Sequence, residues 1–312
     1  METVCEGKQW DVLLSQRDGR IEGALPYLIG RKFGLKYILQ PQLTQFCGPW
    51  YNYPDTQAVL PDRKGTALST AETKSNQAKK QSSNQAIIDF EHRVGGDLAA
   101  QLNALGARLC LMHFSPTVTD WLPFRWAGYQ QTTRYTYRFP SIADPDTLFA
   151  AASRGRKQNM ADVENCCTLD THFDPSQFAR MHREYFERKK GEDLLSQELI
   201  ERVCRTALER GQGLLWALRN TEGKPVNVSF VVYDDRCAYA QMSAITPEAP
   251  RNSQTYLFWQ IIRHLSGKTQ AFDFEGSMDK GNEYFYRTFG TTQTPFFEVY
   301  RFRPRFLSHF IS

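Results

Sequence analysis

The chain has 312 residues, of which 41% are hydrophobic and 13% aromatic, and its formal net charge is +4. This composition excludes an intrinsically disordered chain, and so small a charge does not indicate a DNA-binding surface. No apolar run approaches the ~20 residues that a membrane-spanning helix needs, so no membrane span is expected. A chain of this length predicts two domains with separate hydrophobic cores.

The cysteines and histidines suggest neither a disulfide framework nor a metal site. The seven cysteines are odd in number and contain no Cys-x-x-Cys pair, and the six histidines have no His-Glu-x-x-His spacing. No metal is therefore expected. Reduced thiols are typical of the cytoplasm, which is the predicted location.

The first half of the chain predicts strands around one long helix. Three strands are expected at residues 10–16, 21–30 and 35–40, because the Asp18-Gly19 pair between the first two apolar runs is typical of a hairpin turn. Residues 61–84 hold one large apolar residue and predict a mobile surface loop. The remaining elements expected are a helix at 85–105, a strand at 107–114, a short helix at 119–128 broken by Pro123, and a strand at 132–139.

The second half predicts helices first and then the same order of elements. Asp174 with Pro175, and Ser196, are typical helix starts. The expected order after them is three strands (213–219, 226–233 and 237–244), a helix (253–265), a strand (271–276), a helix (279–289) and a strand (295–302). This repetition predicts two copies of one α/β module, at residues 1–140 and 141–312.

Three stretches carry a resemblance to a known family: residues 18–41 (DGRIEGALPYLIGRKFGLKYILQP), 152–165 (ASRGRKQNMADVEN) and 271–301 (AFDFEGSMDKGNEYFYRTFGTTQTPFFEVYR). With the order of elements, they resemble the GNAT superfamily of N-acetyltransferases, and the duplication resembles the Fem-type peptidyltransferases that add amino acids to peptidoglycan precursors. The last stretch resembles an uncharacterised acyltransferase-like branch more closely. The resemblance implies two tandem GNAT-like modules, each a mixed, mainly antiparallel sheet flanked by helices.

The chain departs from this family pattern at three places. GNAT proteins hold the pyrophosphate of CoA on a glycine-rich segment before a helix, whereas TPEAPRNSQ (246–254) has no glycine. Fem-type enzymes tend to carry a lysine after the phenylalanine of the last helix, where this chain has Phe285-Tyr286-Arg287. Strands are expected from Trp10 onward, so either the sequence starts inside a longer chain or the first module is minimal.

The stretch FDFEGS (272–277) offers candidate catalytic groups for acyl transfer. On a strand, Asp273 and Glu275 share one face, so both carboxylates point into one space, where a partly buried carboxylate suits a general base. Ser277 is expected to cap the next helix or to donate to a substrate. The alternative is structural: the carboxylates pair with Arg287 or Lys280 and fix the turn.

The other candidate residues would bind substrate. Tyr239, Gln241 and Ser243 alternate along one strand and are expected on one face, where Tyr239 would donate a proton or simply pack. An aromatic ring and a cation on the last helix, Tyr286 and Arg287, would hold an anionic substrate. The cations of the junction, Arg154, Arg156 and Lys157, would meet a diphosphate or carboxylate, or form a solvated face.

Three functions are compatible with these residues. The first is an N-acyltransferase that moves an acyl or aminoacyl group, with acyl-CoA as donor, onto a small-molecule or nucleotide-linked amine bound between the modules. The second is a Fem-like transferase that uses aminoacyl-tRNA and a cell-wall precursor. The third is a non-catalytic double module that binds a ligand, since a fold alone does not establish activity.

Overall fold

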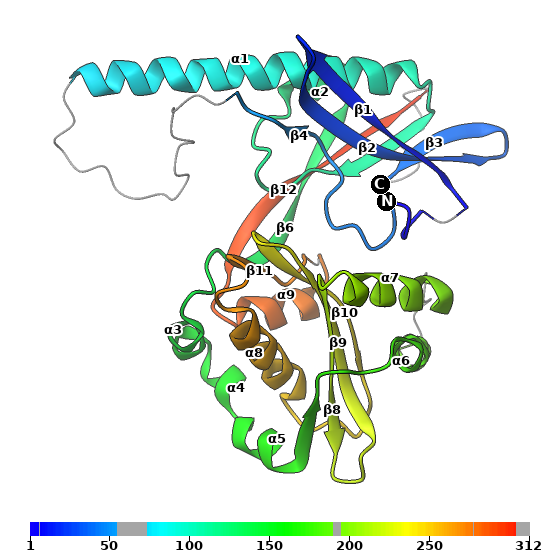
Figure 1. The fold of residues 1–312 in the computed structure, drawn as a ribbon, viewed down its shortest axis with the longest axis vertical. Coiled ribbons are helices and arrows are strands. Elements are labelled where there is room, and N and C mark those ends of the chain that lie inside the picture. Colours follow the sequence, from blue (N-terminus) through cyan, green and yellow to red (C-terminus); the bar gives the residue numbers. More distant parts are fainter. Residues whose placement is uncertain (6, 55–73, 190–194, 277, 304–312) are drawn as a thin grey trace. The chain divides into compact units, whose positions relative to one another are not determined.

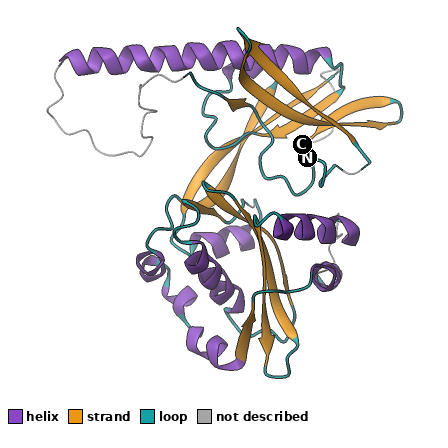
Figure 2. Ribbon diagram, viewed as in Figure 1, coloured by secondary structure: helices purple, strands orange, loops and turns teal. Residues whose placement is uncertain are grey.

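The computed structural model describes residues 1–5, 7–54, 74–189, 195–276 and 278–303, with backbone only for 74–83 (Figures 1 and 2). The chain forms two compact units. Unit 1 comprises Met1–Glu6 and Arg134–Pro295, and unit 2 comprises Gly7–Thr133 and Phe296–Ser312. The division expected from the sequence follows chain order, whereas each of these units combines segments that are distant in sequence.

Unit 2 contains a sheet with the strand order β1-β2-β3-β5-β12. All neighbours in it are antiparallel except β3 and β5, and the first three strands confirm the predicted meander. Its elements are β1 (Gln9–Arg17), β2 (Arg20–Lys32), β3 (Leu35–Leu39), β4 (Trp50–Tyr51), α1 (Lys74–Ala104), β5 (Leu109–His113), α2 (Leu122–Trp126) and parts of β6 (Gln130–Phe139) and β12 (Thr292–Phe302).

The long helix α1 packs its apolar residues against this sheet. Val94 and Leu98 are fully buried with Leu25 and Ile38 of the strands. The helix continues through Gly95, where a Cβ atom would lie 2.9 Å from the Tyr51 hydroxyl, so the glycine permits this close approach.

Two predictions for this region need correction. The helix begins at Lys74, so the described part of the expected 61–84 loop is helical, and residues 55–73 lie outside the described chain. Pro123 does not break the short helix α2. It occupies the first turn, where the missing N–H has no intrahelical acceptor in any case.

Unit 1 contains the strand order β6-β11-β10-β9-β8-β7. Among the described strands of this unit, β10 and β11 are parallel neighbours and the other neighbouring pairs are antiparallel. Its remaining elements are α3 (Pro145–Ala151), α4 (Arg154–Lys157), α5 (Met160–Cys166), β7 (Cys167–Asp170), α6 (Pro175–Arg188), α7 (Gln197–Glu209), β8 (Gly213–Asn220), β9 (Pro225–Tyr233), β10 (Cys237–Ile245), α8 (Ser253–Leu265), β11 (Ala271–Asp273) and α9 (Lys280–Arg287).

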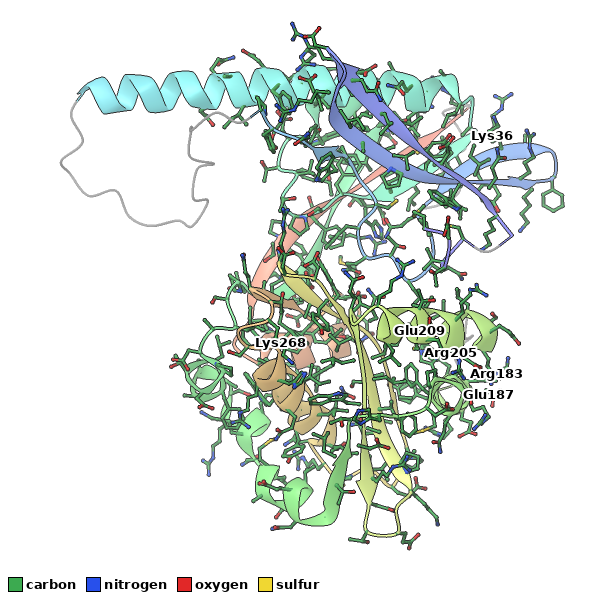
Figure 3. All side chains as sticks on the ribbon, in the orientation of Figure 1. Lys36, Arg183, Glu187, Arg205, Glu209 and Lys268 are labelled. Carbon is green, nitrogen blue, oxygen red and sulfur yellow. The ribbon has the colours of Figure 1, made fainter. Side chains whose placement is uncertain are left out.

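Helices cover both faces of this sheet, with α8 on one face of β8 to β10 and α6 and α7 on the other (Figure 1). The caps predicted for α6 and α7 are confirmed: Asp174 accepts from the Gln177 N–H at 2.9 Å, and Ser196 accepts from the Leu199 N–H at 3.1 Å. Figure 3 shows charged residues along these two helices, among them Arg205, whose Nη2 lies 2.8 Å from Glu201 Oε1. The core on the α8 face is largely aromatic, with Phe258, Trp259, Phe272, Phe274 and Phe289 all buried.

The two halves of the chain repeat one design, as the sequence predicts. Each half has a three-stranded antiparallel meander, a helix, a strand parallel to the third strand, a second helix and a final strand. The final strands are exchanged: β6 pairs with β11 in unit 1, and β12 pairs with β5 in unit 2. None of the helices in the described part of the chain combines the length and hydropathy needed to span a membrane.

Candidate active site

The parallel strands β10 and β11 pair over three positions only. Their ladder ends where Tyr239 lies opposite Asp273, yet β10 continues to Ile245. Beyond Tyr239, β10 pairs with β9 alone, and its register on β9 shifts between Ala240 and Met242. One edge of β10 therefore has no strand partner among the described residues. The Ile245 carbonyl accepts from Arg188 at 2.6 Å, and the backbone groups before it on this edge could hydrogen-bond a ligand.

Asp273 is the last residue of β11 and is completely buried. Thr136 Oγ1 and the Glu275 N–H, the latter at 2.9 Å, both donate to its Oδ1 atom. Arg138 Nε lies 3.2 Å from its Oδ2 atom. Burial raises the pKa of Asp273 to about 6, although Thr136 and Arg138 act in the opposite direction. Asp273 is thus a buried carboxylate held in place by two hydrogen bonds and an ion pair.

Glu275 differs from Asp273 in both backbone and environment. Its φ of +54° lies in the left-handed region, which non-glycine residues seldom occupy and which recurs at functional sites. Its Oε1 atom is buried without a hydrogen-bond partner in the described chain. Burial, and then the charge of Asp273, raise the pKa of Glu275 well above its ordinary value. A carboxylate in this condition is a good proton acceptor.

The backbone on either side of Glu275 is fixed against β6. The Phe274 N–H donates to the Tyr137 carbonyl at 2.9 Å. A Cβ atom on Gly276 would lie 1.8 Å from the Tyr135 carbonyl oxygen, so only glycine allows this approach. The predicted strand is shorter than expected, since β11 ends at Asp273. The prediction that Phe272 and Phe274 face the core is confirmed, because both are fully buried.

Two tyrosines interact electrostatically with the carboxylates. Burial is the main cause of a raised pKa at Tyr239, and the nearby Cys237 and Asp273 add to it. Burial, and then Glu275, raise the pKa of Tyr286 to about 12. The Tyr286 ring packs on Phe274, with the ring centroids 5.7 Å apart. Both phenols therefore remain protonated at neutral pH and are available as proton donors.

The expectation that Tyr239, Gln241 and Ser243 share one face is wrong, because the register shift in β10 interrupts the alternation. Tyr239 lines a cavity beside α7. Ser243 lies 3.0 Å from the Ser229 hydroxyl, which also accepts from Gln254 of α8 at 2.7 Å. Ser243 is therefore linked to α8. Gln241 occupies the shifted segment and is half-buried.

One of the three junction cations, Arg156, contacts the N-terminus of α8. Arg156 Nη1 donates to Thr255 Oγ1 at 3.3 Å, and its guanidinium lies 4.6 Å from the centroid of the Phe285 ring. Burial lowers the pKa of Arg156, and the nearby charge of Arg251 acts in the same direction. Lys157 instead donates to the Ala150 carbonyl at 2.8 Å, and Arg154 is exposed. Two cations, Arg156 and Arg251, thus flank the start of α8.

Asn252 explains how this helix begins without the family's glycine. Its φ of +64° is the left-handed conformation that glycine usually supplies, and asparagine tolerates it better than most residues. Its Nδ2 atom donates to the carbonyls of Gly155 and Gln158, at 2.9 and 3.0 Å. Asn252 therefore ties the junction segment to the N-terminus of α8.

The remaining candidates lie elsewhere, or outside the described residues. Arg287 forms an ion pair with Glu283 at 2.8 Å, and Asp273 forms one with Arg138. The alternative in which Asp273 pairs with Arg287 or Lys280 therefore had the wrong partners. Ser277 lies outside the described residues. The sequence analysis missed Thr136 and Arg138. The alternation of TTRYTYRF places both on one face of β6, which was the available signal.

The corresponding place in unit 2 is occupied by the chain itself. There β3 and β5 are parallel and pair as far as Leu39 opposite Leu111. Beyond that point, Gln40 Oε1 accepts from the His113 N–H at 2.8 Å, and the Cys47 N–H donates to the His113 carbonyl at 2.8 Å. Among the described strands, the parallel pair β10 and β11 leaves an unpaired edge beside a carboxylate pair, and the parallel pair β3 and β5 does not.

The described residues contain no group of three or more His, Cys, Asp or Glu side chains arranged to hold a metal ion. None of the seven cysteines, all of which lie in the described residues, forms a disulfide bond.

A family model described as "Acetyltransferase (GNAT) domain" matches residues 148–286. Residues 148–286 are therefore similar in sequence to a GNAT acetyltransferase domain. This range holds α8, β10, β11, both carboxylates and both tyrosines of the site. The matched range thus includes the part of unit 1 in which the parallel strands β10 and β11 separate.

Three solved structures share the fold over most of the chain. The crystal structure of FemX has a TM-score of 0.58 and 12% identity, covering 93% of this chain and 88% of that one. L-PGS from Bacillus licheniformis has a TM-score of 0.53 and 13% identity, with coverages of 97% and 87%. A tandem GNAT protein from the clavulanic acid biosynthesis pathway has a TM-score of 0.51 and 9% identity, with coverages of 95% and 83%.

No curated protein matches the chain by sequence. At these identities the structural likenesses show the fold alone. That fold is a mixed α/β, duplicated GNAT-like architecture, and it supports acyl or aminoacyl transfer in general terms.

Proposed function

We propose that the GNAT domain transfers an acyl or aminoacyl group from a thioester or a tRNA ester to an amine, with Glu275 as the general base. The observation that carries this proposal is the state of Glu275. It is held in a left-handed conformation, its Oε1 atom is buried without a hydrogen-bond partner in the described chain, and its pKa is raised. Such a carboxylate accepts a proton more readily than an ordinary surface glutamate.

The reaction follows from the groups around Glu275. The amine nitrogen attacks the carbonyl carbon of the donor, so that an N–C bond forms and the C–S or C–O bond breaks. Glu275 accepts the proton that the nitrogen loses, and Tyr286 or Tyr239 donates one to the departing sulfur or oxygen. A proton returned from Glu275 then restores the tyrosine. Asp273 keeps Glu275 in place by accepting its N–H.

The unpaired edge of β10 and the start of α8 suit the acyl donor. Backbone N–H and C=O groups on that edge would bind an amide-containing arm and the reacting carbonyl. The N-terminus of a helix favours phosphate groups, and Arg156 and Arg251 add positive charge there. These features support a donor that carries phosphates, which both acyl-CoA and aminoacyl-tRNA do.

The aminoacyl-tRNA reaction remains a second candidate, since the same cations would meet an RNA backbone and the fold resembles that of FemX. The acceptor would then be a nucleotide-linked precursor. A cytoplasmic location and a non-catalytic, ligand-binding role both stay predictions from the sequence.

A binding experiment separates these candidates. Thermal unfolding of the purified chain is measured with acetyl-CoA, longer acyl-CoAs, free CoA, charged tRNA and UDP-linked cell-wall precursors. A ligand at about 100 times its Kd adds ~2.7 kcal/mol to stability. Stabilisation by the thioesters supports the first candidate, and stabilisation by charged tRNA or UDP precursors supports the second. If no compound of the panel stabilises the protein, the result would contradict both candidates.

A further inference from the structure

A cavity of about 300 Å³, wide open to solvent, lies in unit 1 on the face of the sheet that α7 covers. Its lining comes from the N-terminal segment, α7 and the hairpin that joins β9 to β10. The lining residues include Val4, Val203, Thr206, Arg210, Asp234 and Tyr239. This volume stands at the lower end of the range for small-molecule sites, so it suits a compact ligand.

Two opposite charges line this otherwise largely apolar cavity. Arg210 is the C-cap of α7, and Asp234 follows β9 in the hairpin. The Tyr233 N–H donates to the Gln212 carbonyl at 2.9 Å, which brings the two charged residues to the same end of the β8–β9 pair.

Neither charge is neutralised within the described chain. Arg210 forms no ion pair there. Asp234 uses only its Oδ1 atom, which accepts from the N–H groups of Arg236 and Cys237 at 2.8 Å each. An arginine and an aspartate that share a cavity without pairing complement a ligand with both a carboxylate and an ammonium group.

Tyr239 connects the cavity to the candidate active site. It lines the cavity and also lies opposite Asp273 at the end of the β10–β11 ladder. Tyr239 thus links the cavity to Asp273, and the cavity lies on the face of the sheet opposite α8, whose N-terminus is the proposed binding place of the acyl donor. A ligand in this cavity would approach the reacting centre from the side away from the donor.

We propose that this cavity binds a zwitterionic α-amino acid as the amine acceptor, with its carboxylate at Arg210 and its ammonium group at Asp234. A diamino acid such as lysine fits best, because its side-chain amine extends past Tyr239 toward Glu275 while both α-groups stay bound. The role as acceptor rests on the proposed function. Binding of the amino acid does not.

The test measures binding without any acyl donor. Isothermal titration of the full chain compares L-lysine with cadaverine, which lacks the carboxylate, and with 6-aminohexanoate, which lacks the α-ammonium group. We expect L-lysine to bind about fivefold more tightly than either analogue, since an exposed ion pair contributes up to ~1 kcal/mol.

Variants assign each charge to one end of the ligand. Arg210→Gln should abolish the preference for L-lysine over cadaverine. Asp234→Asn should abolish the preference for L-lysine over 6-aminohexanoate. Arg180→Gln and Asp235→Asn change two exposed residues outside the cavity lining, so they serve as matched controls and should leave both preferences unchanged. Circular dichroism melting checks that every variant folds.

Equal binding of all three compounds, no binding of any, or preferences that survive both variants would overturn the proposal. These outcomes would leave the acyltransferase proposal standing, because that proposal is tested by donor binding and by Glu275. Conversely, if the chain binds L-lysine tightly but binds none of the acyl donors, this would support the amino-acid site and contradict the proposed reaction.

Discussion

Asp273 lies opposite Tyr239 at the last paired position of the parallel strands β10 and β11. Beyond this pair, the two strands no longer hydrogen-bond to each other, and the chain turns through Glu275 in a left-handed conformation. The most buried carboxylate of the site therefore marks the start of the unpaired β10 edge. The predictions below test whether this arrangement performs acyl transfer.

Glu275 should make the stability of the protein depend on pH. Its pKa is raised by folding, so its ionisation opposes folding: stability falls as the pH rises from the unfolded pKa of about 4.5 toward the folded value. We expect Glu275→Gln to remove the part of this fall that Glu275 causes and to leave the part from Asp273, whose pKa is also raised, so that the variant matches the wild type at pH 4 and is more stable at pH 8. Urea unfolding at pH values from 4 to 8 measures the free energy of unfolding of both proteins. Parallel curves for the two proteins would refute the account of Glu275.

Gly276 should be intolerant of any side chain. A Cβ atom would meet the Tyr135 carbonyl at 1.8 Å, so Gly276→Ala must displace the backbone next to Glu275. We expect a loss of roughly 2 kcal/mol or more in the free energy of unfolding, together with loss of turnover. Gly96→Ala is the control, because a Cβ atom there meets nothing within 4 Å. Equal stability of the two variants would contradict the close packing against β6.

Thr136 should act as a positioning residue through Asp273. Its hydroxyl donates to the buried carboxylate and lowers the pKa of Asp273. Thr136→Val should raise that pKa above about 6, so that Asp273 becomes protonated, and the Glu275 N–H loses its charged acceptor, at a higher pH. The acidic limb of the kcat/KM profile should then shift upward by about one pH unit. Thr136→Ser, which keeps the hydroxyl, should restore the wild-type profile. A purely structural role would lower stability without moving this limb.

Arg156 should contribute to donor binding and not to chemistry. Removing its charge at the start of α8 weakens attraction for phosphate groups, so Arg156→Gln should raise KM for the donor several-fold at unchanged kcat. Arg263→Gln, on the same helix and paired with Asp146, is the matched control. A fall in kcat with constant KM would place Arg156 in the reaction itself.

Much of the fold followed from local patterns in the sequence. The Asp18-Gly19 turn, the helix caps at Asp174 and Ser196, and the repeated order of elements all depend on neighbouring residues. The exchange of β6 and β12 between the two units could not be predicted, because strand pairing is a long-range property. The helical start at Lys74 was missed because its residues lack the apolar periodicity that indicates a helix.

The candidate site was predicted in part. Strand alternation identified Asp273, Glu275 and the buried phenylalanines, but a single shift in β10 moved Ser243 away from the face of Tyr239. Thr136 and Arg138 contact Asp273 from a strand more than a hundred residues away, and only the folded chain reveals that contact. The role of Asn252 depends on its positive φ, which was not predicted from the sequence.

The most direct test of the central claim measures thiol release from acetyl-CoA, with L-lysine and a panel of other amines as acceptors, for the wild type and Glu275→Gln. The account predicts acceptor-dependent release by the wild type and a loss of at least about a hundredfold in kcat for the variant, with donor binding retained. Glu248→Gln, an exposed glutamate before α8, should behave like the wild type. Undiminished turnover by Glu275→Gln would show that Glu275 is not the base and would contradict the account.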